Sequence, residues 1–347
     1  GEATTPSALG VQVVAYDRSR IGAGGGALSV STGKGSASAG AAISIVDMKG
    51  STSAVLNAGT MTRVHDLAVA ALSSQKVVGM AAVASVQTDA SSKGQLMGSF
   101  VFNQIGNTVG AGVKGAATVN LTGDLAIQAG GAPTDSTLDA LVGAVRSSTM
   151  IDYEMASTSN GYTDDLKNAV GGESILGVAG TLGLTLGSNA ASLGLSYVHN
   201  SIQTSYDAEL NGSISVGGEV SVQAISEADI VGVSVGLGAT KGKFSGMGSA
   251  SVNLIGQRTR ALVTGGSVTA SGLEVTSQTR GNQFGLAGNL SIAVGGGSGN
   301  AAGAAVSYTL SAGRDYNVGG DTSSTRSAGN EASISDATVD VGSGDVV

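Results

Sequence analysis

Apolar residues alternate with glycine or small polar residues along most of the chain. In one clear example, Val231, Val233, Val235 and Leu237 alternate with Gly and Ser. A period of two residues is typical of a β-strand and differs from the 3.6-residue period of a helix. Clusters of Gly, Asn, Ser and Thr separate these runs and provide turns. The pattern predicts an all-β protein.

Two short motifs recur in a fixed order. The first is a small-residue run that ends in an apolar residue and Asn, and the second is Gly-x-apolar-x-apolar-x-Ala, as at 123–129 and 218–224. The first motif can be anchored at Asp47, Asn103, Asn200, Asn253 and Tyr308. These anchors are 56, 97, 53 and 55 residues apart, which defines a unit of about 55 residues with roughly 40 extra residues in one copy.

A repeat of this kind predicts a solenoid, because strands of successive units can stack about 4.8 Å apart along one axis. Aromatic residues are only 3% of the chain, so we expect a narrow core of Ala, Val, Leu and Ile. At roughly 20–25 residues per coil, two coils are expected in each unit. The expected organisation is repeats over 1–131, a lateral insertion over 132–172 and repeats over 173–347.

The insertion breaks the alternation. Leu138, Leu141 and Val145 have helical spacing, and a shorter helix is expected over 163–169. Insertions in solenoids emerge as lateral loops and often carry binding, and this one gathers aromatic, Met and acidic side chains. The candidate partner-binding residues are Met150, Asp152, Tyr153, Glu154, Met155, Tyr162, Asp164 and Asp165.

Composition excludes several classes of protein. The net charge is −8 with no basic cluster, which argues against nucleic-acid binding. The absence of Cys excludes disulfide frameworks and cysteine-based metal sites. No 18-residue run is apolar enough for a membrane helix, and no signal peptide is recognisable. The chain begins and ends in phase with the repeat, so we expect it to be a slice of a longer array.

Catalytic chemistry has little support in the sequence. The two histidines, His65 and His199, occupy different phases of the repeat, and neither has a nearby acidic partner of obvious spacing. No Gly-x-Ser-x-Gly elbow occurs in a strand-turn-helix context. The acidic residues of the insertion are interpreted as solvating an exposed loop. Gly319-Gly320-Asp321 is only a fragment of a calcium-binding repeat. We expect no catalytic, metal or cofactor site.

The order and spacing of the motifs resemble the repeats of giant filamentous haemagglutinin-like adhesins, in particular the leukotoxin-like filamentous adhesins of Gram-negative bacteria. The resemblance rests on the run leading to Val-Asn-x-Ile, an Ala eight positions after the Asn, and the Gly-Gly-x-Val-x-Val-x-Ala ending. It covers most of 8–131 and 173–347. It implies a right-handed parallel β-helix that is exported through an outer-membrane partner and displayed on the cell surface.

If the Asn residues stack as a ladder inside a turn, the units anchored at Asp47 and Tyr308 lack that rung. The leading hypothesis is a structural stalk or adhesive segment of a large secreted bacterial surface protein, acting in host attachment or biofilm. One alternative is a module that binds a host receptor or glycan through the 132–172 insertion. Two others are a carbohydrate-active β-helix enzyme and a matrix protein whose solenoid ends associate end to end into filaments.

Overall fold

The computed structural model describes residues 10–57, 59–131, 172–295, 299–312 and 329–347. These residues form sixteen strands in two sheets, and all the pairings between named strands are parallel. Sheet A contains β1 (Val11–Asp17), β2 (Arg20–Ser31), β5 (Leu67–Ser73), β6 (Lys76–Gln87), β8 (Leu125–Ala129), β9 (Glu173–Thr185), β11 (Glu219–Thr240) and β13 (Gly272–Ala293). Sheet B contains β3 (Ala37–Leu56), β4 (Thr60–Val64), β7 (Gly94–Leu121), β10 (Ala191–Val216), β12 (Phe244–Thr269), β14 (Asn300–Ala312), β15 (Gly329–Ser335) and β16 (Thr338–Asp340). The prediction of an all-β chain with parallel strands is confirmed.

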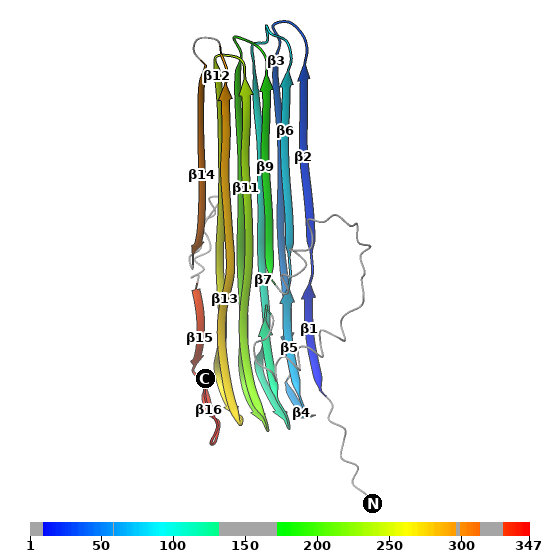
Figure 1. Ribbon diagram of the computed structural model, residues 1–347. Coiled ribbons are helices and arrows are strands. Elements are labelled where there is room, and N and C mark those ends of the chain that lie inside the picture. The colour runs from blue at the N-terminus through cyan, green and yellow to red at the C-terminus, as the bar shows by residue number, and fades with distance from the viewer. Residues whose placement is uncertain (1–9, 58, 132–171, 296–298, 313–328) are drawn as a thin grey trace, which may run out of the picture.

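The chain alternates between the two sheets, so each unit gives one long strand, or a set of short strands in line, to each sheet (Figure 1). Val11 pairs with Leu67, and Leu67 pairs with Leu125, which shows that strands one full unit apart are direct neighbours. The expectation of two coils per unit is therefore wrong. The strands are longer than expected: β7 has 28 residues, which corresponds to roughly 90 Å of extended chain. The long dimension follows the strands rather than the stacking direction.

The pairing register aligns Asn103, Asn200 and Asn253 across β7, β10 and β12. It does not align Asp47 or Tyr308 with them. Val46 pairs with Asn103 and Thr309 pairs with Asn253, so both expected anchors are displaced by one residue. A shift of one residue changes the face of a strand. Asp47 and Tyr308 are accordingly exposed on the outside of sheet B, whereas the three Asn residues are buried inside.

The space between the sheets has two zones. Over the N-terminal half of each sheet A layer, the interior is aliphatic, with fully buried side chains such as Leu67, Val109 and Ile127. Over the C-terminal half, which we call the polar half, inward Gly, Ser, Thr and Asn residues alternate with two smaller aliphatic clusters, one around Ile175 and Ile202 and the other around Val101 and Val198. There the Ser234 hydroxyl lies 2.9 Å from that of Ser196 across the sheets. The expected narrow aliphatic core therefore fills only part of the interior.

The three asparagines form a ladder in the middle of the long strands, not inside a turn. Asn103 Nδ2 donates to Asn200 Oδ1 and Asn200 Nδ2 donates to Asn253 Oδ1, both at 2.9 Å. Asn200 and Asn253 also donate across the interior to sheet A carbonyls, at 3.3 Å and 3.0 Å. The ladder therefore joins successive units and ties sheet B to sheet A. Because these side chains are buried, an amide group that lost its hydrogen-bond partner would have no water molecule to replace that partner.

A column of glycines in sheet A faces this ladder. A Cβ atom on Gly79, Gly177 or Gly232 would lie closer than 3.0 Å to the amide oxygen of the facing Asn. In the first unit this glycine position is occupied by Ala23, and the facing position is Val46. These two side chains pack in one apolar cluster. The alternation of Gly in the strands of sheet A thus has a packing reason, which is room for an amide from the opposite sheet.

We expect Gly177→Ala to lower the free energy of unfolding by about 1–3 kcal/mol, because the added methyl overlaps the Asn200 amide and the fully buried surroundings cannot move away. Gly110→Ala is the matched control, since its added Cβ would meet no atom closer than 4.0 Å. Urea unfolding followed by circular dichroism measures both. Equal destabilisation by the two substitutions would show that the glycine column has no special packing role.

Candidate functional site

The expected partner-binding residues lie within 132–171, outside the residues that the structure describes. The same holds for the two expected helices. These residues are Met150, Asp152, Tyr153, Glu154, Met155, Tyr162, Asp164 and Asp165. The described flanks show where the insertion is attached, which is between β8 and β9 in the middle of a sheet A layer.

The chain leaves sheet A through two glycines with left-handed backbone angles, Gly130 at φ 76° and Gly131 at φ 48°. A side chain at either position would be strained in this conformation. A Cβ at Gly130 would also overlap the Tyr206 ring. Gln128 Nε2 fixes the turn by donating to the carbonyls of Gly130 and Gly131, at 2.7 Å and 2.9 Å. The exit of the insertion is therefore firmly held.

The chain returns at a buried carboxyl group. Glu173 is 1% exposed, accepts a hydrogen bond from the Tyr206 hydroxyl, and accepts another from Asn107 Nδ2 at 3.3 Å. Burial raises the pKa of Glu173 to about 7, although hydrogen bonds from Tyr206, Asn107 and Ser73 partly oppose this. Burial also raises the pKa of Tyr206, and the neighbouring Glu173 charge adds to the rise. This carboxyl group is closed off from solvent and is suited to anchoring the return strand.

This carboxyl cluster is not evident from the sequence alone. Its members come from different units, and only the stacking of those units brings them together. One signal was present: Glu173 occupies the position of the small residues Ala228 and Gly281 in the following units and of the uncharged Gln75 in the preceding unit. A charged residue at a position that is otherwise uncharged in these units marks a departure from the repeat, and here it falls where the insertion ends.

An aromatic cluster lies on the outer face of sheet B. The ring of Tyr197 is 5.5 Å from that of Phe102 and 6.4 Å from that of His199, with the Tyr197 and His199 rings stacked. The Tyr197 hydroxyl lies 3.4 Å from His199 Nδ1. Burial lowers the pKa of His199, so the neutral imidazole is favoured. The other histidine, His65, is not part of this cluster. Its Nδ1 atom lies 2.8 Å from the Thr122 hydroxyl.

Charged side chains gather further along the same face. Arg258 and Arg260 bind Asp207 at 3.0 Å and 2.7 Å. Burial raises the pKa of Asp207, but the hydrogen bond and charge of Arg260 and the charge of Arg258 outweigh it and hold the pKa below its ordinary value. Every group in this cluster is paired with an opposite charge. The arrangement stabilises the stacking of β10 on β12 and leaves no group in position for acid–base chemistry.

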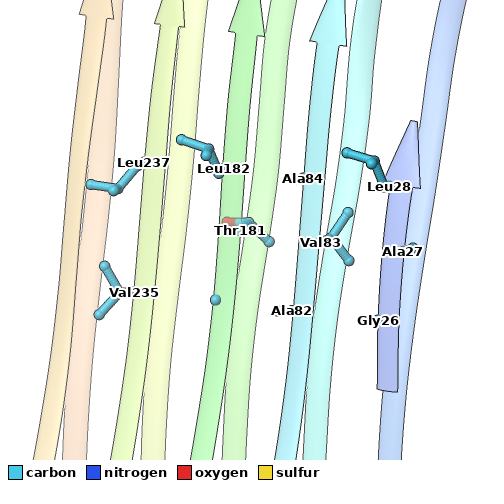
Figure 2. A pocket seen from close by; sticks show the side chains of 11 residues that line it. Gly26, Ala27, Leu28, Ala82, Val83, Ala84, Thr181, Leu182, Val235 and Leu237 are labelled. Carbon is cyan, nitrogen blue, oxygen red and sulfur yellow. The ribbon is translucent and has the colours of Figure 1, made fainter. Parts of the chain in front are cut away.

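A shallow apolar groove of about 710 Å³ crosses the outside of sheet A. Figure 2 shows its lining, with Leu28, Ala84, Leu182 and Leu237 in one row across the strands and Gly26, Ala82 and Val235 in the row below it. The groove contains no charged side chain. Within the described ranges, no group of three or more His, Cys, Asp or Glu side chains could hold a metal ion. No helix in that part of the chain is long and apolar enough to span a membrane.

Comparisons with protein-family models, with curated proteins and with solved structures gave no match to this chain.

The Glu173 carboxyl group predicts a specific pH dependence of stability. Because its pKa is raised in the folded state, the folded protein binds the proton more tightly than the unfolded chain. The stabilisation is complete below about pH 4.5 and is lost as the pH rises through about 7. A shift of this size corresponds to about 3 kcal/mol.

Urea unfolding between pH 5 and pH 8 should therefore show stability falling with pH in the wild type and a flatter profile in Glu173→Gln. Glu219→Gln, at an exposed site, is the control and should keep the wild-type slope. A slope that survives Glu173→Gln would assign the pH dependence to another group.

Proposed function

We propose that this chain is a structural and adhesive segment of a large secreted bacterial surface protein, folded as a right-handed parallel β-helix of about five units. The observation that supports this most directly is the asparagine ladder, which links three successive units through equivalent side chains. A chain built from stacked equivalents presents the same outer surface unit after unit. Such regularity suits a scaffold that repeats its contacts more than a site that needs one specific constellation.

The dimensions favour surface area over length. Each unit of about 55 residues adds only one strand spacing, about 4.8 Å, along the stacking direction. The same unit adds one strand, or a set of strands in line, to each sheet. In sheet B these strands reach 28 residues in β7 and 26 residues in β10. A segment of this kind forms a broad blade, so its contribution to attachment is the area of its two outer faces.

A second candidate function is recognition of a receptor or glycan by the 132–172 insertion. It is favoured by the way the insertion is attached. Its exit is fixed by Gln128 and the two glycines, and its return by the buried Glu173–Tyr206 contact. A loop whose two ends are held rigidly on a sheet loses less conformational entropy when it binds a partner.

Adhesion can be tested with beads that carry the purified chain. We expect the beads to bind cultured epithelial cells or immobilised host glycans several-fold above beads that carry the heat-unfolded chain, because the contacts depend on the folded faces. Incubation of the soluble chain with acidic polysaccharides, with and without calcium, should release no product. Binding no better than that of the unfolded chain, or release of oligosaccharides, would contradict the proposed function.

Deletion of 132–171 tests the second candidate. The deletion leaves Gly130, Gly131, Gly172 and Glu173 between positions that pair with Ala71 and Lys76, the same four-residue link that the preceding unit has. We therefore expect the melting temperature to change little. If the insertion is the contact, adhesion of the beads falls to the unfolded-chain level, whereas adhesion that persists in the folded deletion variant excludes it.

A further inference from the structure

In the polar half of the molecule, which is named for its interior, the outer face of sheet A is entirely apolar. Five alternate outward residues on each of five adjacent strands are Gly, Ala, Val, Leu, Ile, Met or Phe, with no polar or charged side chain among them. We call this surface the apolar face. It consists of the outward positions of 22–30 in β2, 78–86 in β6, 176–184 in β9, 231–239 in β11 and 284–292 in β13.

One inward position of each central strand is committed to the ladder. Gly79, Gly177 and Gly232 must remain glycine to receive the asparagine amides, and in this stretch most of the large residues of the same strands lie on the other side. As a result Leu28 is 75% exposed and Leu290 is 54% exposed. A contiguous exposed apolar surface of this size is rare in a protein that works alone and marks an interaction surface.

The apolar face has a relief that complements itself. A low row runs across the strands through Gly26, Ala82, Gly180 and Gly288 and is broken only by Val235 in β11. Next to it runs a row of leucines, Leu28, Leu182, Leu237 and Leu290, which is broken by Ala84 in β6 (Figure 2). A two-fold axis parallel to the rows and between them would place Leu28, Leu182 and Leu290 of each copy over glycines of the other, whereas Leu237 would lie over Val235. A self-complementary patch of this kind is what an isologous dimer requires.

We infer that the apolar face binds the same face of a second copy of this chain. Five strands at about 4.8 Å spacing and ten residues at about 3.3 Å rise give a face of roughly 800 Å². Specific interfaces bury about 800 Å² on each partner. The five described strands alone therefore present enough area for a specific interface, and their outward side chains carry no charge whose burial would oppose association.

A lipid surface fits the apolar face less well. Lys241 and Lys243 in the adjoining turn could contact anionic headgroups, but β2 and β13 each have only one partner strand at the level of the apolar face among the described strands. In the isolated chain used for the test below, the outer edges of these two strands would carry unpaired backbone groups into the hydrocarbon, at several kcal/mol per group. Packing face to face with a second copy covers the apolar side chains and leaves those edges in water.

The association is tested by sedimentation velocity over a dilution series. We expect the wild type to dimerise, and the double variant Leu182→Thr/Leu237→Thr to raise the dimer Kd at least tenfold. Thr suits an outward strand position, so the fold should be kept. Ala82→Glu, which puts a charge in the low row, should have the same effect. The matched control is Leu193→Thr/Leu195→Thr on the outer face of sheet B, with similar exposure, and it should keep the wild-type Kd.

Circular dichroism and thermal unfolding confirm that each variant is folded. The inference is overturned by a wild type that stays monomeric at all concentrations, by a dimer that survives both sheet A variants, or by an equal loss in the sheet B control. A dimer that survives would indicate pairing through the free strand edges. Flotation with phosphatidylcholine–phosphatidylserine vesicles, abolished by Leu182→Thr/Leu237→Thr in a chain that forms no dimer, would identify a lipid surface as the occupant instead. These outcomes do not depend on whether the chain is an adhesin.

Discussion

The contact between the asparagine ladder and the glycine column sets the arrangement of the rest of the molecule. Asn200 and Asn253 are each held by a neighbour in the stack and by a carbonyl of the opposite sheet, whereas Asn103 is held by Asn200 alone. A buried amide with these partners is stabilising, and without them it is costly. The facing glycines supply the room, and where Ala23 removes that room the amide is replaced by Val46. Asn103 Oδ1, which faces this end of the stack, has no hydrogen-bond partner.

This contact also explains why the molecule is apolar on the outside in the same region. A strand has two faces, and a face given to Gly, Ser and Asn leaves the other for Val and Leu. In the other half, where the interior is aliphatic, large apolar side chains such as Leu67 and Ile127 point inward, as is usual in proteins. The change occurs along single continuous strands such as β11. One half of the molecule therefore buries its large apolar side chains between the sheets, and the other half exposes many of them on the outside of sheet A.

The insertion is placed at the boundary between these two halves. Its flanks meet the buried Glu173 and Tyr206, and Asn107 and Ser73 complete the contact with a hydrogen bond of 2.6 Å between them. Four residues bridge the same interval in the unit before, so the insertion interrupts the layer without changing its register. A recognition loop could thus be added to the blade without disturbing the stacking that the function proposed here depends on.

Local pattern was enough to predict the strands, their parallel stacking and the unit of about 55 residues, because alternation and self-similarity are properties of the sequence itself. The alternation was compatible with either face pointing inward, and it therefore could not place Val231 or Leu237 outside. Only the opposite sheet decides this, since the glycine face is the one that admits an Asn amide. The register of degenerate units was decided in the same way: Val46 and Thr309, not Asp47 and Tyr308, take the ladder position because backbone pairing fixes which side chains share a face. The carboxyl cluster around Glu173 likewise exists only once separate units are stacked, because no short segment contains its members.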